Sequence, residues 1–199
     1  MATEKPKRKA PFNTNVLESW VGAYARANDI APKRLNRWIY SMVVLAALEP
    51  LRDDEDKPLF VLRGGVAMEL RLGLEARATK DIDTVFRESM DRMLVRLDEA
   101  LRAGYGDFTF ERTEAETIGE TNSQRLDVLL SYRGRRWGTV QLEIAPVEGK
   151  SIEDVDNVEA IGIGNFGLDG PDEVPCLTVR YQIAQKLHAC TAPPPEGKD

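Results

Sequence analysis

Residues 59–87 read LFVLRGGVAMELRLGLEARATKDIDTVFR, and this stretch decides the fold. It opens with a short apolar run, passes through two adjacent glycines into a segment with helical spacing, and ends in Asp81-Ile82-Asp83 and further apolar residues. A short apolar run followed by glycines is typical of a buried strand that turns into a helix. We therefore predict a strand at 59–62, a helix at 66–72 and a second strand at 82–86.

The spacing of apolar residues predicts helices and strands on both sides of this stretch. A first helix is expected from Asn15, with Glu18 in a capping arrangement, to about residue 28. Further helices are expected at about 33–50, from 90 to a cap at Gly104, and from 178 to the proline run at 193. A strand at 108–111 and a hairpin formed by 125–133 and 137–145, turning at Gly134, are predicted from alternation. Residues 146–176 have weak periodicity and predict mostly loop, with one short strand.

The composition favours a single globular unit. With 199 residues, of which 42% are hydrophobic, the chain is long enough to bury one sizeable core. No apolar run approaches the roughly 20 residues of a membrane span, and no apolar segment follows the charged N-terminus. We therefore expect a soluble cytoplasmic protein with no membrane partner and a disordered basic leader at residues 1–13. Cys176 and Cys190 lack a metal-like spacing, so buried free thiols are expected.

Acidic side chains at the end of the opening stretch point to metal chemistry. Asp81 and Asp83 are one residue apart, so a strand would send both carboxylates to the same face. Two adjacent carboxylates repel each other, and Mg²⁺ commonly binds one or two carboxylates together with substrate phosphates. Glu143, displayed from the interior of another predicted strand, would complete a site for metal ions. An Asp-x-Asp on its own also occurs in ordinary surface loops, so the neighbouring residues carry the interpretation.

Those neighbouring residues are of kinds that bind phosphate. Gly64 and Gly65 lie between a strand and a helix, where backbone N–H groups can approach an anion and the helix dipole favours it. Arg77, Thr79 and Lys80 stand directly before the carboxylates and could bind the outer phosphates. The alternative is a simple tight turn followed by a solvated loop. The net charge of −6 argues against a generally sticky nucleic-acid binder, yet basic residues outnumber acidic ones in residues 1–80.

Four segments resemble one known family over nearly the whole chain. FVLRGGVA at 60–67, RATKDID at 77–83, VQLEI at 140–144 and IAQKLHA at 183–189 are similar to the AbiEii-type nucleotidyltransferases, the toxins of type IV toxin-antitoxin and abortive-infection systems. The resemblance implies an α+β fold, with a polymerase β-like nucleotidyltransferase core whose mixed sheet is flanked by helices. It implies this core at 14–176 and the start of a helical C-terminal part at 177–199.

The same resemblance implies a set of functional residues. Gly64 and Gly65 match the glycine motif, Asp81 and Asp83 the metal-binding pair, Glu143 the third carboxylate, and Lys186 the nucleotide-contacting lysine. The sequence departs from the family pattern in three respects. Gly65 replaces a small hydroxyl residue, and Glu143 stands where Asp is common, with Asp127 as the alternative. The family also continues into an Arg/Lys-Asp-x-x-Asp helix, whereas this sequence ends at Asp199, so we expect the C-terminal part to be incomplete.

The resulting hypothesis is a metal-dependent toxin nucleotidyltransferase. Asp81 and Asp83 would bind Mg²⁺, or Mn²⁺ in its place, and Glu143 would help to activate the acceptor hydroxyl as a metal ligand or as a base. Lys186, Arg77, Thr79, Lys80 and the glycine backbone would hold a nucleoside triphosphate. The resemblance implies transfer of a nucleoside monophosphate to the 3′ end of tRNA, which would block translation, and a cognate antitoxin encoded nearby that need not bind the toxin directly. Two alternatives stay open: a nucleotide-binding protein without transferase activity, and a transferase acting on a protein or small-molecule hydroxyl.

Overall fold

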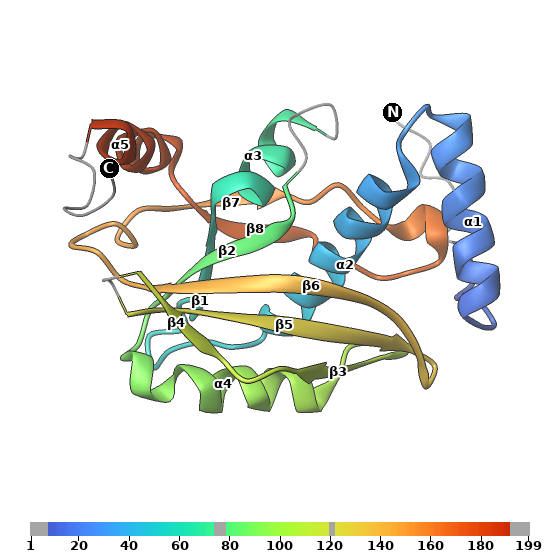
Figure 1. Cartoon of the computed structure of the whole chain (residues 1–199), viewed down its shortest axis with the longest axis horizontal. Coiled ribbons are helices and arrows are strands. Elements are labelled where there is room, and N and C mark those ends of the chain that lie inside the picture. Colours follow the sequence, from blue (N-terminus) through green and yellow to red (C-terminus); the bar gives the residue numbers. More distant parts are fainter. Residues whose placement is uncertain (1–7, 74–78, 120–121, 192–199) are drawn as a thin grey trace, which may run out of the picture.

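One mixed β-sheet organises the chain (Figure 1). The computed structural model describes residues 8–73, 79–119 and 122–191, without the side chains of residues 188 and 189. The helices in these ranges are α1 (Thr14–Ala27), α2 (Pro32–Leu48), α3 (Gly64–Leu72), α4 (Met90–Ala103), α5 (Val179–Thr191) and the short 3₁₀-helix η1 (Gly164–Phe166). The strands are β1 (Phe60–Arg63), β2 (Asp81–Phe86), β3 (Phe108–Arg112), β4 (Glu116–Ile118), β5 (Ser123–Tyr132), β6 (Arg135–Pro146), β7 (Val155–Glu159) and β8 (Glu173–Leu177).

The sheet places β2 and β6 side by side near its centre. Its order is β3-β5-β6-β2-β1-β8-β7, with β4 also paired to β5. The pairs β2–β6 and β1–β8 are parallel, whereas β1–β2, β3–β5, β4–β5, β5–β6 and β7–β8 are antiparallel. The predicted α+β class with a mixed sheet flanked by helices is therefore confirmed.

Alternation along the central strands separates an apolar face from a polar one. Apolar residues of the first face are buried in a core shared with α2 and α4, and they include Ile82, Leu126, Val128, Val140, Leu142 and Ile144. Figure 1 shows α4 along one side of the sheet and α3 and α5 on the other. The half-buried residues Asp81, Asp83 and Glu143 alternate with the core residues of β2 and β6. The fold thus keeps one face of its central strands for polar side chains.

Leu142 tests the assignment of the core. It has no exposed surface and lies on the interior strand β6. Leu142→Ala should lower the free energy of unfolding by about 3 kcal/mol, because the lost methyl groups leave a cavity. Val95 on α4 is 59% exposed, so the control Val95→Ala should change the stability by less than about 0.5 kcal/mol. Urea denaturation followed by circular dichroism measures both, and equal losses would contradict this core.

Several predicted boundaries are confirmed with small shifts. The hairpin turns at Arg133 and Gly134, whose φ angles of 48° and 78° are those a two-residue hairpin turn requires. The helix that begins at residue 90 ends before Gly104 as predicted. The cap predicted at Asn15 is wrong, because Asn13 caps α1 by accepting the N–H of Val16 at 3.0 Å. The glycine pair also lies inside the first turn of α3 rather than before it.

The region 146–176 contains more strand than predicted. Both β7 and β8 belong to the sheet, with Asp156 opposite Cys176 and Leu62 opposite Cys176 on the other side. The polar strand β7 lies at the sheet edge, and β8 carries Pro175, which cannot donate to a ladder. Neither strand therefore has the alternation that identifies a half-buried strand from sequence. The sequence also gives no prediction of a strand at the position of the short strand β4.

The last helix is oriented differently from the expectation. Its predicted apolar stripe is present but exposed, with Val179 at 38%, Ile183 at 53% and Leu187 at 61%. The polar Gln182 is instead buried, and it donates its amide to the carbonyl of Leu177 at 2.9 Å. The helix thus turns a polar side toward the sheet.

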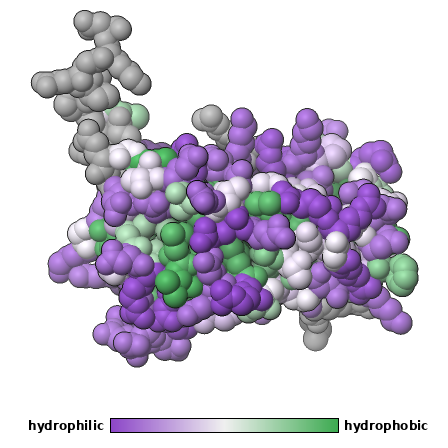
Figure 2. Space-filling view, turned by 60° about the horizontal axis from the view of Figure 1, so that its bottom comes forward, coloured by the Kyte–Doolittle hydropathy of each residue, from purple (hydrophilic) through white to green (hydrophobic). Residues whose placement is uncertain are grey.

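The surface carries few other large apolar groups. Figure 2 shows a face that is mostly hydrophilic, with hydrophobic residues gathered on its left half.

Both cysteines are free, but only Cys176 is buried as predicted, whereas Cys190 is exposed. Among the described residues, none of the helices is both long and apolar enough to span a membrane.

Candidate active site

A row of charged residues crosses four neighbouring strands. Arg63 of β1 lies opposite Asp83 of β2, which lies opposite Glu143 of β6, which lies opposite Arg125 of β5. Asp81 stands two residues before Asp83 on the same face of β2, as the sequence predicted. Two cations therefore flank the carboxylates of three acidic residues on the polar face of the sheet.

The two aspartates of β2 carry an electrostatic penalty when charged. Burial, followed by the charges of Glu143 and Asp81, raises the pKa of Asp83 from 3.8 to about 6, against the opposing effects of Arg63 and the Gly65 N–H. Burial and the charge of Glu143 likewise raise the pKa of Asp81. A cation bound between these two carboxylates would relieve the penalty.

Arg125 is a member of this row that sequence reasoning missed. Its Nε and Nη2 contact the same oxygen of Glu143, Oε1, at 2.8 and 2.7 Å. Simple counting back from the hairpin turn would place Arg125 opposite Leu142, but a register shift between Leu130 and Ser131 moves it opposite Glu143. The ion pair thus depends on a β-bulge that has no clear signature in the sequence.

The alternative third carboxylate lies farther from the aspartate pair. Asp127 of β5 is opposite Gln141, which in turn is opposite Asp81, so one strand separates the two acids. Glu143 lies on the strand adjacent to β2 and raises the pKa of both aspartates. Glu143 is therefore the better placed of the two.

The two glycines are required by the protein's own side chains. Gly64 has a φ of 67°, and a Cβ there would lie 2.1 Å from Asp83 Oδ2. A Cβ on Gly65 would lie 2.5 Å from the Cβ of Thr79 and 2.6 Å from its Oγ1. The Gly65 N–H also donates to the Asp83 carboxylate. The glycine turn therefore packs directly on Asp83 and Thr79.

A buried acid holds the segment before β2 in place. Glu69 of α3 is 5% exposed, contacts Arg34 of α2 at 3.1 Å and accepts the backbone N–H of Thr79. Burial raises the pKa of Glu69 despite these partners. Sequence reasoning assigned Glu69 no role, because a single acid on a short helix gives no signal. It fixes Thr79 against Gly65.

A cavity of about 200 Å³ lies between α5 and the row of charged residues on the sheet. Its lining residues come from β1, α3, β2 and α5, and they are Arg63, Gly64, Asp83, Gln182, Gln185 and Lys186. The cavity brings Lys186, more than 100 positions away in the sequence, to the glycine turn and Asp83. Thr79, Lys80, Asp81 and Glu143 are not among these lining residues. Thr79 lies against Gly65, the charges of Asp81 and Glu143 act on Asp83, and the charge of Lys80 acts on Asp81. Arg77 lies outside the described residues.

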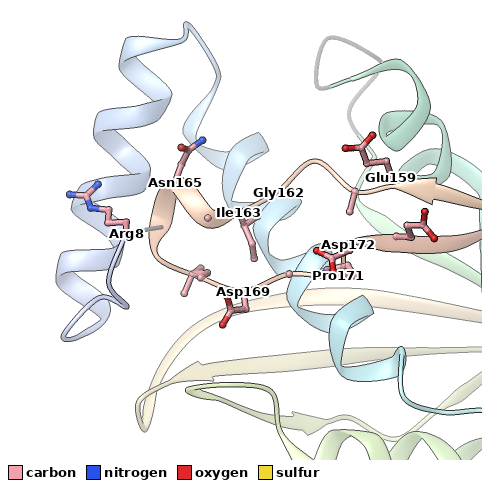
Figure 3. A pocket seen from close by; sticks show the side chains of 13 residues that line it. Arg8, Glu159, Gly162, Ile163, Asn165, Asp169, Pro171 and Asp172 are labelled. Carbon is pink, nitrogen blue, oxygen red and sulfur yellow. The ribbon is translucent and has the colours of Figure 1, made fainter. Parts of the chain in front are cut away.

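A larger cavity of about 950 Å³ lies elsewhere, along the segment 159–173 (Figure 3). Its charged lining is mainly acidic: Glu159, Asp169, Asp172 and Glu173 stand against Arg8, the one cation among the lining residues that the structure describes. A polyphosphate would be repelled by these carboxylates. The smaller cavity beside Asp83 is therefore the candidate nucleotide site.

The donors around Asp83 suit a divalent cation completed by substrate oxygens. Within the part of the chain that the structure describes, no three His, Cys, Asp or Glu side chains are placed together as a metal site. Asp81 and Asp83 form a carboxylate pair, and Arg125 holds Glu143. Mg²⁺ typically binds one or two carboxylates plus phosphates, so the pair fits such an ion once a triphosphate is present.

Comparison with known proteins identifies the family and the fold. The family model of the nucleotidyl transferase AbiEii toxin, type IV TA system, matches residues 46–199. Among solved structures, the nucleotidyltransferase toxin MenT4 of Mycobacterium tuberculosis H37Rv is similar over 86% of this chain, with a TM-score of 0.61 and 19% identity. This chain covers 58% of MenT4, and hence less than two thirds of its length.

Two weaker structural similarities were also found. One is to a Thermotoga maritima protein provisionally described as a nucleotidyltransferase, with 13% identity and a TM-score of 0.43 over 74% of this chain and 80% of that one. The other is to the Megavirus polyadenylate synthase, with 9% identity and a TM-score of 0.27 over 90% of this chain and 30% of that one. Among curated protein sequences, none matches significantly. The family match covers more than half of the chain and MenT4 shares its fold, so the chain belongs to the AbiEii family of nucleotidyltransferase toxins of type IV toxin-antitoxin systems.

Proposed function

We propose that this chain transfers a nucleoside monophosphate from a nucleoside triphosphate to the 3′ end of tRNA in the cytoplasm, and so blocks translation. The observation that carries the proposal is the cavity where Gly64, Asp83 and Lys186 meet. Anionic phosphates would there face Lys186 and Arg63 beside a carboxylate pair that would hold a cation. The tRNA acceptor is supported by the family resemblance and by the excess of basic residues in residues 1–80, because Lys and Arg supply affinity for nucleic-acid phosphates.

The residues of the site would have different roles in such a transfer. Asp81 and Asp83 would hold Mg²⁺, or Mn²⁺, which when bound supplies positive charge to the phosphates. Lys186, Thr79 and Lys80, together with Arg77 and the Gly64-Gly65 backbone, would orient the triphosphate. The acceptor oxygen attacks the α-phosphorus and forms a new P–O bond, while the bond to the β-phosphate oxygen breaks and pyrophosphate leaves.

Glu143 is proposed to receive the proton of the acceptor hydroxyl. Both Arg125 contacts end on Oε1, so they orient the carboxylate and leave Oε2 to accept the hydrogen bond. A general base must lie within hydrogen-bond reach of the proton that it takes, and the contacts with Arg125 would keep the carboxylate in one orientation for an acceptor bound beside it. Arg125 is thus proposed as a positioning residue for Glu143.

A labelling experiment tests the proposal. The protein is incubated with each α-labelled nucleoside triphosphate, Mg²⁺ and total cellular RNA, and RNA, protein and small molecules are then separated. We expect label in tRNA, and at least about 10³-fold less with the Asp81→Ala/Asp83→Ala variant, because several kcal/mol of transition-state stabilisation are lost. Equal labelling by the variant would refute the role of the pair.

The same experiment separates the two alternatives. Label in the protein or small-molecule fraction would identify a different acceptor. Tight binding of the triphosphate with no labelled product would identify a nucleotide-binding protein without transferase activity. The family also implies an antitoxin partner, and we propose that its gene lies next to this one, without requiring a direct complex.

A further inference from the structure

Arg63 lies at the edge of the candidate nucleotide site, beside Asp83. It is the last residue of β1, lies opposite Asp83 and lines the cavity together with Lys186. We infer that Arg63 binds the pyrophosphate portion of the nucleoside triphosphate and stabilises it as the leaving group. This inference rests on the proposed nucleotidyl transfer and names a residue that selects triphosphates over monophosphates.

The strand order supplies the geometric argument. β2 lies between β6 and β1, so Glu143 and Arg63 stand on opposite sides of Asp83. With a strand spacing of roughly 4.8 Å, their backbones are about 10 Å apart. The attacking and leaving oxygens of a phosphoryl transfer lie roughly in line on opposite sides of phosphorus. If the acceptor hydroxyl approaches beside Glu143, the pyrophosphate leaves toward Arg63 and Lys186.

Arg125 and Arg63, the two arginines in the row of charged residues, differ in their ion pairs. Arg125 contacts Glu143 through two nitrogen atoms. Arg63 is close enough to lower the pKa of Asp83, yet among the described residues it makes no ion pair with Asp83 or with any other acid. A half-buried guanidinium that faces a cavity without such a partner presents several donors in the planar arrangement that phosphate oxygens accept. Arg63 is therefore suited to bind a ligand.

Arg63 would act on the reaction through charge. Negative charge accumulates on the leaving pyrophosphate as the bond to the α-phosphorus breaks, and a fixed guanidinium stabilises it. Arg63 also contributes to binding of any ligand that carries the β- and γ-phosphates. It has no such contact with a nucleoside monophosphate.

The test compares ligands that have and lack these phosphates. Binding of a nucleoside triphosphate, its monophosphate and inorganic pyrophosphate is measured by calorimetry, with Mg²⁺ present, for the wild type, Arg63→Met and Arg63→Lys. For Arg63→Met we expect about 10- to 100-fold weaker binding of the triphosphate and pyrophosphate, because a charge-assisted contact is lost. Binding of the monophosphate should change less than about threefold, and Arg63→Lys should be intermediate.

A matched control and a second readout keep the test decisive. Arg102→Met makes the same chemical change at an exposed position near the end of α4, so binding of all three ligands should stay unchanged. In the wild type, pyrophosphate should protect Arg63 from an arginine-specific dicarbonyl reagent, measured by mass spectrometry, whereas the monophosphate should not. This protection needs no substitution and remains measurable if the variants fold poorly.

Each result has a distinct meaning. Three results would overturn the role of Arg63 and leave the proposed function in place. Arg63→Met could weaken binding of all three ligands equally, or it could leave triphosphate binding unchanged. In the wild type, pyrophosphate could fail to protect Arg63 from the reagent. A wild type that binds neither triphosphate nor pyrophosphate would instead overturn the proposed function. Triphosphate-selective weakening together with protection supports both.

Discussion

Replacing Asp83 by Asn should reduce nucleotide transfer by about 10³-fold and, in the metal-free protein at neutral pH, increase the stability of the fold. Activity should be lost because Asn lacks the charge that holds the divalent cation in the proposed mechanism, and with it several kcal/mol of transition-state stabilisation. Asn keeps the shape of Asp and an oxygen that can accept the Gly65 N–H. The expected loss of activity is therefore not a consequence of misfolding.

The gain in stability follows from the raised pKa of Asp83. Burial and the neighbouring acids raise this pKa from 3.8 to about 6 in the folded protein. At neutral pH the folded state must therefore keep a charge that costs about 3 kcal/mol relative to the unfolded chain, at about 1.4 kcal/mol for each pKa unit. Asn has no charge and removes this cost. The proposed cation site thus weakens the fold as long as no cation is bound.

The pH dependence fixes the sign of this effect. A carboxyl group with a raised pKa binds more protons in the folded state, so its favourable contribution is complete below about pH 4 and is lost as the pH rises through 6. The advantage of Asp83→Asn should therefore be absent near pH 4, grow between pH 4 and 6 and stay constant above. Urea denaturation of the chelator-treated protein at pH 4.5 and pH 7.5 measures it.

The control for this comparison makes the same substitution in an exposed loop. Asp29 lies between α1 and α2 with a φ of 52°, a conformation that Asn also tolerates. Asp29→Asn should leave both transfer and its pH profile unchanged. A lower stability of Asp83→Asn than of the wild type at pH 7.5 would contradict the electrostatic penalty proposed for Asp83.

Local sequence signals predict the geometry of the half of the candidate site that lies within one stretch. Asp81 and Asp83 alternate with buried residues on β2, so their shared face follows from a period of two. The strand, glycine pair and helix follow one another without long-range contacts. Glu143 could be placed on a polar face because its own strand alternates clearly.

Contacts that depend on register or on tertiary packing could not be predicted in the same way. Arg125 reaches Glu143 only because a bulge shifts the hairpin by one residue. Glu69 reaches Thr79 through the packing of α3, and Gln182 is buried although an apolar stripe lies on the same helix. These arrangements depend on how elements that are separate in sequence meet. Periodicity within one element carries no information about them.

The Gly64→Ala substitution should be the most damaging single-methyl change in the site. It should lower the free energy of unfolding by about 3 kcal/mol or more, because two costs add. The φ of 67° disfavours a residue with a Cβ by about 1 to 2 kcal/mol. The new methyl would also lie 2.1 Å from Asp83 Oδ2, so the carboxylate must move. Transfer should fall by about 10²-fold, as expected when a reacting group is misplaced by about 1 Å.

A second glycine separates these two costs. Gly73 has a φ of 82°, and a Cβ there would meet nothing within 4 Å. The Gly73→Ala variant therefore carries the backbone cost alone, about 1 to 3 kcal/mol, and should leave transfer close to that of the wild type. If both alanine variants lost stability and activity equally, the contact between Gly64 and Asp83 would have no special importance.

A double-mutant cycle with Asp83→Ala measures the contact itself. Removing Oδ2 and Cγ leaves only the Asp83 Cβ, 3.0 Å from the new methyl, so Gly64→Ala should cost little more than its backbone strain in this background. We expect a coupling energy of about 1 to 2 kcal/mol between the two positions in thermal or urea unfolding. Additive losses would show that the turn tolerates a side chain beside Asp83. Coupled losses would mean that Gly64 is kept small by the carboxylate that it packs against, before any nucleotide binds.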